Sequence, residues 1–197
     1  MSDAAREGKG GRAAILAAAE ALFEAEGAEG FTVRAVAVRC GMTATALYRH
    51  FTDRDALLGE VLAAARRRFD DALARGADLP DPVERLLATG EGYLRFVAAH
   101  PQSYRALFLG PPRTPRHFTR DFAEGRAAGF QLLVGRIGAC QAAGRLPPGD
   151  PLGLALTLWS SIHGLSALWI TGQLGLGRAA FLRRGRDLTR WVTRLAG

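Results

Sequence analysis

The sequence predicts an all-α protein of about nine helices without a sheet, and three observations support this class. Apolar residues recur at the three- and four-residue spacing of a helix through most of the chain. No stretch alternates convincingly between apolar and polar residues, as a half-buried strand would. The 197 residues, 48% of them hydrophobic, suffice for one sizeable core or two small ones. We therefore expect a globular helical protein.

The chain begins with a segment, residues 1–11, that is rich in Gly, Ser, Asp and Lys and is expected to be a mobile tail. The first helix is expected from about residue 12 to residue 26, with Gly27 near its end. The apolar residues on its buried side are Ile15, Ala19, Leu22 and Phe23. This helix is expected to support the segment that follows.

Residues 32–51 contain two short helical patterns around a glycine and no acidic residue. Thr32 and Thr43 stand before the two patterns as N-caps. Gly41 lies between them and can adopt the positive φ that a tight turn requires. The pattern is typical of a helix-turn-helix, although an ordinary helical hairpin has the same spacing.

The local charge of this segment favours a polyanionic partner. Between Thr32 and Thr52 the only charged side chains are Arg34, Arg39 and Arg49. Contacts from Arg, Tyr, His and helix N-termini to phosphates give salt-sensitive affinity, whereas side chains in the major groove read bases. The whole chain has a formal net charge of +7, which fits the same partner. Arginines scattered over a solvated surface are the alternative explanation beyond residue 55.

Thr52 to Asp55 is expected to form a capping box that opens a longer helix. Apolar residues then step by four and three along this helix: Leu58, Leu62, Ala65, Phe69 and Ala72. The next helix is expected to start at Asp81-Pro82 and to be interrupted at His100-Pro101, and a short helix follows that ends at Gly110.

A long helix is expected from about residue 114 to residue 143. It contains Gly125, Gly129, Gly135 and Gly138, each of which costs about 1 kcal/mol relative to alanine, so we expect close helix contacts or a kink there. Asp150-Pro151 opens the penultimate helix, and the last helix is expected over residues 177–195.

The penultimate segment, residues 152–170, is almost continuously apolar. A membrane span is one interpretation, but a histidine and three serines in the middle of the segment do not favour it. A helix that is apolar on all sides must be covered on all sides, so burial between two subunits is the preferred interpretation.

The stretch from Phe31 to Leu58 resembles the DNA-binding signature of the tetracycline-repressor (TetR) family of bacterial transcriptional regulators. The resemblance lies in Phe31-Thr-Val-Arg-Ala-Val-Ala, Cys40-Gly-Met-Thr and Ala46-Leu-Tyr-Arg-His-Phe-Thr-Asp-Arg-Asp-Ala-Leu-Leu58. It implies that backbone phosphates are contacted by Thr32, Tyr48, His50 and Arg54, and that bases or their sugars are faced by Arg34, Thr43, Ala44 and Thr45. The family usually has lysine in place of Arg54, and arginine keeps the charge but changes the donor geometry. Ala44 could make only an apolar contact, for example with a thymine methyl group.

The same resemblance implies that the last two helices pair with their symmetry mates as a four-helix bundle. The candidate interface residues are Leu154, Leu158, Leu165, Leu168, Leu188 and Trp191. A two-fold dimer places its two reading helices about 34–36 Å apart and therefore predicts a pseudo-palindromic operator.

Two further segments resemble a Trp-His-Gly subgroup of this family, namely His100-Pro-Gln-Ser-Tyr-Arg-Ala-Leu-Phe108 and Trp159-Ser-Ser-Ile-His-Gly164. In that subgroup the Trp-x3-His-Gly pattern marks the effector-binding domain. Trp159 and His163 share a helical face, and an aromatic lining could come from Tyr93, Phe96, Tyr104, Phe108, Phe122 and Phe130. The alternative is that these aromatics are core residues and that His163 is a satisfied buried polar group.

Catalytic, cofactor and metal sites are not expected. No recognisable catalytic spacing occurs, and the four histidines and two cysteines lie in separate segments. No N-terminal apolar stretch resembles a signal peptide, which favours a cytoplasmic location.

We expect a DNA-binding domain at residues 12–55 and an effector-binding and dimerisation domain at residues 56–197. The predicted function is a homodimeric transcriptional repressor that a small-molecule effector releases from a palindromic DNA operator. The alternative is an effector-binding or adaptor protein that does not bind an operator.

Overall fold

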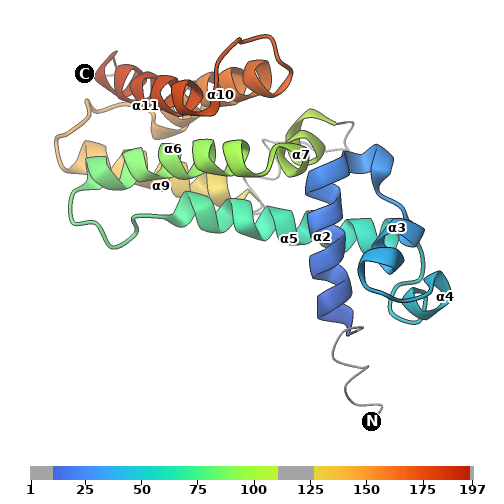
Figure 1. Ribbon diagram of the computed structural model, residues 1–197. Coiled ribbons are helices and arrows are strands. Elements are labelled where there is room, and N and C mark those ends of the chain that lie inside the picture. Colours follow the sequence, from blue (N-terminus) through green and yellow to red (C-terminus); the bar gives the residue numbers. More distant parts are fainter. Residues whose placement is uncertain (1–10, 111–126, 196–197) are drawn as a thin grey trace. The chain divides into compact units, whose positions relative to one another are not determined.

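The computed structural model describes residues 11–110 and 127–195, with side chains described as far as residue 191. Within these ranges the chain forms nine α-helices and one π-helical turn, and no strand (Figure 1). The predicted all-α class is confirmed. The chain divides into two compact units: Met1–Arg67 with His100–Gly110, and Arg68–Ala99 with Pro111–Gly197. The expected functional boundary at residue 55 stays a prediction.

The first unit is built on α2 (Arg12–Gly30), α3 (Val33–Arg39), α4 (Ala44–Leu47) and the first part of α5 (Arg54–Ala74). The predicted buried side of α2 is confirmed, because Ile15, Ala19 and Leu22 are fully buried and Phe23 is nearly so. Phe31 packs edge-on against Phe23 with ring centroids 5.8 Å apart. This core holds α3 and α4 against α2.

The end of α2 differs from the prediction. The helix was expected to stop at residue 26, but helical turns continue to Gly30 beyond an irregular residue at Gly27, which has φ 69° and ψ −166°. Glycine adopts this conformation without a Cβ penalty, so the chain kinks there and resumes one more turn. The additional turn carries Ala28, whose carbonyl oxygen accepts a hydrogen bond from Arg54.

A short helix, α7 (Pro101–Tyr104), and the π-helical turn η1 (Arg105–Leu109) complete the first unit. Glu24 of α2 binds the start of α7: its Oε1 accepts a hydrogen bond from the Ser103 amide at 3.2 Å and another from the Ser103 hydroxyl. His100 Nδ1 lies 3.8 Å from the same oxygen. A carboxylate at this position satisfies amide groups that a helix N-terminus leaves unpaired.

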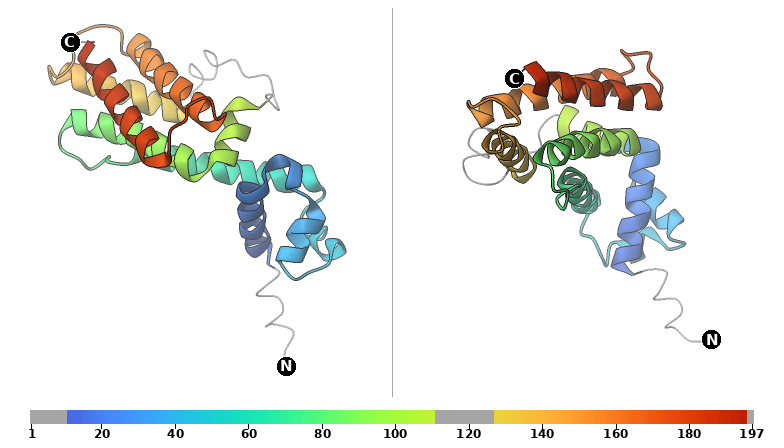
Figure 2. Two further views of the ribbon diagram at one scale, coloured as in Figure 1. Left: turned by 45° about the horizontal axis from the view of Figure 1, so that its top comes forward. Right: turned by 90° about the vertical axis from the view of Figure 1, so that its left-hand side faces the viewer.

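The second unit contains α6 (Pro82–Ala99), α9 (Ala128–Ala142), α10 (Pro151–Ile170), α11 (Arg178–Leu195) and the end of α5. In Figure 2, α10 and α11 lie side by side over α6 and α9. Helix α6 approaches α5 so closely that a Cβ atom on Gly92 would lie 1.8 Å from the Ala72 carbonyl oxygen. Only glycine fits at this crossing.

The glycines predicted to mark close contacts in the long helix behave differently from one another. A Cβ on Gly129 would lie 2.6 Å from Leu73 Cδ1, which confirms the close approach there. Gly135 and Gly138 have nothing within 4 Å of such an atom among the described residues, so the prediction is wrong for them. Gly125, and the expected start of this helix at residue 114, lie outside the described residues.

A buried arginine ties three helices of the second unit together. The Arg136 side chain of α9 donates to the carbonyl oxygens of Ala74, Arg75 and Arg85 at 3.0, 3.0 and 2.5 Å, and to Thr89 Oγ1 at 2.6 Å. Arg136 is 6% exposed. Burial, and the nearby charge of Arg85, lower the pKa of its guanidinium, which still remains charged because arginine is so strong a base.

The two C-terminal helices begin and meet as the residue types dictate. Asp150 caps α10 by accepting from the amides of Leu152 and Gly153, both at 2.9 Å, which confirms the predicted start at Asp150-Pro151. At the other end Trp169 stacks on Phe181 with centroids 4.3 Å apart. This stack fixes the turn between α10 and α11.

Candidate nucleic-acid interface

The segment from Thr32 to Phe51 forms two capped helices around a glycine turn. Thr32 Oγ1 accepts from the Ala35 amide at 3.1 Å, and Thr43 Oγ1 accepts from the Ala46 amide at 3.2 Å. Gly41 adopts φ 66°, as the sequence predicts. These caps and the turn confirm the expected helix-turn-helix geometry.

Most of the residues predicted to contact DNA are exposed on this segment. The exposed ones are Thr32, Arg34, Thr43, Thr45, Tyr48 and His50, whereas Ala44 and Arg54 are half-buried. Tyr48 is 51% exposed although it is aromatic. The two capping threonines accept their bonds through oxygen lone pairs, so each hydroxyl proton can still be donated to a phosphate. The surface therefore offers several donors and no carboxylate of its own.

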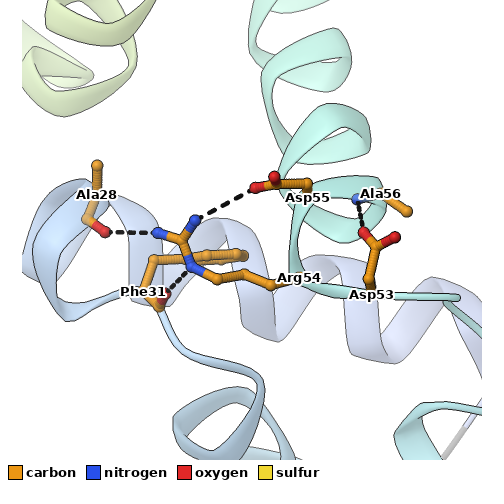
Figure 3. Close-up of polar contacts among 6 residues, drawn as sticks. All are labelled: Ala28, Phe31, Asp53, Arg54, Asp55 and Ala56. Atoms are coloured by element: carbon orange, nitrogen blue, oxygen red, sulfur yellow. Dashed lines mark hydrogen bonds and ion pairs between the residues drawn. The ribbon is translucent and has the colours of Figure 1, made fainter.

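Two of the predicted contact residues have roles inside the protein. Ala44 packs against the core of the first unit. Arg54 donates from Nε to the Phe31 carbonyl oxygen at 2.8 Å and from Nη2 to the Ala28 carbonyl oxygen at 2.9 Å (Figure 3). Its Nη1 lies 3.3 Å from an oxygen of Asp55. Their contacts with DNA stay predictions.

The helix cap next to Arg54 differs by one residue from the predicted capping box. Asp53, not Thr52, is the cap: its Oδ1 accepts from the Ala56 amide at 2.7 Å, and α5 begins at Arg54. An aspartate one residue later serves equally well because either side chain can reach a free amide of the first turn.

Sequence reasoning missed Val38, which is 71% exposed. The signal was available, because Val38 is an apolar residue that falls outside the buried stripe of its helix. The same surface lacks neutralising partners. Among the described residues Arg34 and Arg49 have no carboxylate partner, whereas Arg39 pairs with Glu26 at 3.2 Å. Two arginines therefore remain for an external anion.

In the second unit, the predicted effector residues form an aromatic cluster around His163. Tyr93 Oη and His163 Nδ1 are 3.1 Å apart, with donor and acceptor set by the tautomer. The Trp159 ring lies 5.5 Å from the His163 ring, and Phe130 packs edge-on to Trp159 at 6.0 Å. Burial lowers the pKa of His163, which favours the neutral imidazole.

Other members of the predicted lining are placed differently. Phe96 joins the cluster through Phe69, which packs edge-on to both Phe96 and Tyr93 at 5.1 and 5.3 Å. The sequence pattern places Phe69 only in the buried stripe of its helix and gives no sign of this contact. Tyr104 and Phe108 belong to the first unit, where their rings lie 5.0 Å apart. Phe122 lies outside the described residues.

The predicted dimer surface is partly uncovered. Trp191 is 60% exposed and Leu168 is 40% exposed, while Leu154, Leu165 and Leu188 are half-buried. Leu158 is 1% exposed and packs inside its own chain, so it offers no surface to a partner. Leu156, which is absent from the predicted interface, is 37% exposed. An open groove on α11 is lined by Arg184, Asp187, Leu188, Arg190 and Trp191.

Helix α10 is long and apolar enough to cross a membrane by length and composition, and it alone meets this criterion among the described residues. One such helix is weak support for a span, since core and interface helices have the same composition. In the described part of the chain, no cluster of three His, Cys, Asp or Glu side chains could hold a metal ion.

A capped helix-turn-helix joined to a larger helical unit places the chain among helix-turn-helix DNA-binding proteins. Residues 15–61 match the sequence profile of the bacterial regulatory proteins of the tetR family. Residues 86–187, more than half of the chain, match the tetracyclin repressor-like C-terminal domain. The chain belongs to this family of bacterial transcriptional regulators. The Trp-His-Gly subgroup stays a prediction.

Solved structures show the same fold. A protein of unknown function from Rhodococcus sp. RHA1 is 29% identical with a TM-score of 0.72, over 92% of this chain and 95% of that one. The TetR family regulator PfmR from Thermus thermophilus is 19% identical with a TM-score of 0.69, over 91% and 97%. AibR, solved with isovaleryl coenzyme A and operator DNA, is 24% identical with a TM-score of 0.64, over 90% and 96%. No curated protein matches the chain.

Proposed function

We propose that this protein is a transcriptional repressor that binds a pseudo-palindromic operator as a homodimer and is released by a small-molecule effector. The carrying observation is the exposed helix-turn-helix surface, on which Arg34, Arg49 and Tyr48 stand without a carboxylate of the same segment. A surface of this kind gains free energy by displacing counterions from DNA phosphates.

The proposed contacts divide by chemistry. Phosphates are bound by Thr32, Tyr48 and His50, which fix register, and bases or sugars are faced by Arg34, Thr43, Ala44 and Thr45. Arg54 has the same expected role by resemblance, but its guanidinium already donates to the Phe31 and Ala28 carbonyl oxygens, which favours a role within the protein. The DNA-binding domain is proposed at residues 12–55, after a tail of residues 1–11, and residues 56–197 bind effector and dimerise. This role does not require enzymatic activity. It does require a cytoplasmic location.

Dimerisation is proposed through the uncovered side of α10 and α11. Trp191 and Leu168 expose large apolar areas, and Leu154, Leu165 and Leu188 are half-buried beside them. A second copy that covers this surface would gain the free energy of burying it, about 25 cal/mol for each Å². The two-fold symmetry then requires two inverted half-sites in the DNA.

The effector is proposed to bind in the second unit at the cluster formed by Tyr93, Phe96, Phe130, Trp159 and His163. A neutral imidazole supplies one donor and one acceptor among aromatic rings, which suits a largely apolar ligand with one polar group. AibR has the same fold and was solved with isovaleryl coenzyme A and operator DNA, which supports the capacity of this fold to hold a small molecule together with DNA. Differential affinity for two states of the dimer would produce release.

Selection of bound duplexes from a random DNA pool tests this proposal. We expect an inverted repeat with half-sites about one helical turn apart. If Arg34 and Arg49 of each protomer each displace one counterion from the DNA, the slope of log K against log salt is about −3.6, and a fourfold rise in salt weakens binding about 150-fold.

Two variants sharpen the same experiment. Tyr48→Phe is expected to weaken binding to every operator variant about equally, because it removes a phosphate donor. Thr45→Val is expected to change the preference at one base-pair position. Arg95→Gln, on the exposed side of α6, is the control and should bind as the wild type does. A uniform loss for Thr45→Val would contradict the assignment of this residue to base reading.

The alternative function is an effector-binding or adaptor protein that does not use an operator. It would be supported by a folded dimer that enriches no DNA sequence, with or without candidate effectors, and whose weak DNA affinity changes little with salt.

A further inference from the structure

We propose that Arg54 is a positioning residue that locks the helix-turn-helix to α2 and α5, and that its guanidinium acts on DNA binding through this lock and not through a phosphate contact. The inference rests on the proposed function above for its DNA readout. Its structural part concerns contacts within the first unit alone.

The first step is the donor inventory of Arg54. Its side chain has five N–H groups. Nε donates to the Phe31 carbonyl oxygen at 2.8 Å, Nη2 to the Ala28 carbonyl oxygen at 2.9 Å, and Nη1 faces Asp55 at 3.3 Å (Figure 3). The guanidinium carbon also lies 5.8 Å from the centre of the Phe31 ring. Three of the five N–H groups therefore face protein acceptors, one on each nitrogen, and Nη1 and Nη2 each keep one further N–H.

The second step is the position of these acceptors. Ala28 lies in the last turn of α2 and Phe31 is its C-cap, so their carbonyls belong to the set that a helix end leaves without intrahelical donors. A cation at this end is also attracted by the negative end of the helix dipole. A phosphate could reach only the one N–H that each Nη keeps, so the lock and a phosphate contact have to be distinguished by experiment.

The third step is what the lock determines. Phe31 immediately precedes Thr32, the N-cap of α3, and Arg54 itself begins α5 directly after the segment that contains α4. Arg54 thus joins the residues on both sides of the helix-turn-helix, which are 23 positions apart in the sequence. Holding these two ends together fixes the orientation of α3 and α4 within the first unit.

Lysine would form this lock less well. Its three N–H donors share one nitrogen of a compact ammonium group, whereas the planar fork of arginine reaches separate acceptors in fixed directions. Arg54→Lys therefore keeps the charge and removes the geometry, and Arg54→Gln removes both. The two variants distinguish a positioning role from a phosphate contact.

The test measures operator affinity at several salt concentrations for the wild type, Arg54→Lys and Arg54→Gln. We expect both variants to bind about tenfold more weakly, with the salt slope of the wild type and a smaller preference for operator over scrambled DNA. A phosphate contact predicts a different result. Arg54→Lys would then bind like the wild type, and Arg54→Gln would lower the slope by about 1.8, or 0.9 for each protomer. That result, or unchanged affinity in both variants, would overturn the proposal.

A readout without DNA separates this inference from the proposed function. Hydrogen exchange of amides 28–36 is expected to accelerate in Arg54→Lys relative to the wild type, while exchange in α6 stays unchanged. If the wild type selects no operator, the proposed function fails, and this measurement still decides the lock. Equal exchange at residues 28–36 in the two proteins would overturn the positioning role, and circular dichroism establishes that both proteins are folded.

Discussion

Replacement of Arg136 by methionine should lower the stability of the second unit more than any surface arginine substitution. The side chain is 6% exposed, and its four acceptors are neutral groups on α5, on α6 and on Arg75, the residue that follows α5. Methionine fills the space of the aliphatic stem but donates no hydrogen bond. The substitution leaves the carbonyl groups of Ala74 and Arg75 at the end of α5 without this donor.

The magnitude follows from the two opposing contributions. The bonds to Ala74 and Arg75 are part-buried, so each carbonyl that loses its donor costs about 1–3 kcal/mol, and removal of the buried charge recovers part of its desolvation penalty. With two carbonyls at the end of α5, we expect a net loss of about 2–4 kcal/mol. For a chain of this length each kcal/mol shifts Tm by about 2–4 °C, so Tm should fall by roughly 4–16 °C.

Thermal and urea unfolding of wild type, Arg136→Met and Arg95→Met at one protein concentration measure this difference. A fixed concentration is needed because dimerisation would make Tm depend on it. Arg95 bonds Glu91 through two nitrogens at 3.0 and 2.7 Å but is 57% exposed, so its loss should cost about 0.5 kcal/mol. Equal effects of the two substitutions would refute the reasoning that burial makes the Arg136 network strong.

Three other outcomes are expected. Burial lowers the pKa of His163, so the folded state binds a proton less readily than the unfolded state. The free energy of unfolding should therefore decline below about pH 6.5, by up to ~1.4 kcal/mol per pH unit. A His163→Gln variant with the same decline between pH 5 and 8 would contradict this. Gly92→Ala should prevent native packing of α6 against α5, whereas Gly135→Ala, in an open helical position, should raise the free energy of unfolding by about 0.5–1 kcal/mol. Equal destabilisation by both substitutions would contradict the close approach at Gly92. Thr43→Ala should cost about 1 kcal/mol through loss of the α4 cap, and Thr43→Ser, which keeps the oxygen, should unfold close to the wild type in urea.

The helix-turn-helix was predictable because its determinants are local. Thr32 and Thr43 need only the amide three residues ahead, and Gly41 needs only its own φ angle. The Asp150 cap of α10 is local in the same way. One-residue errors, such as the cap at Asp53, arise where neighbouring side chains can satisfy the same amides.

The contacts that could not be predicted join residues distant in the sequence. Arg136 and its acceptor Arg75 are 61 positions apart, and no local pattern distinguishes Arg136 from the exposed arginines of the chain. The single-sequence interpretation of charge therefore missed the arginine that is most buried among the described residues. The same limit applies to Arg54, because resemblance assigns its side chain to DNA and no local pattern indicates its acceptors Phe31 and Ala28.

The chain passes between the two units within α5, at the junction of α6 with α7, and after Gly110. Helices α5 and α7 belong to the first two of these crossings. Within the first unit, the start of each helix is bound to the C-terminal part of α2. Glu24 holds the start of α7 through Ser103, and the Ala28 carbonyl holds the start of α5 through Arg54. These anchors lie four residues apart, on either side of the kink at Gly27. The proposed effector acts in the second unit, so we expect a displacement of α5 or α7 to reach the helix-turn-helix through this part of α2. Loss of the Arg54 fork would loosen one of the two anchors. It should therefore impair recognition without removing a DNA contact.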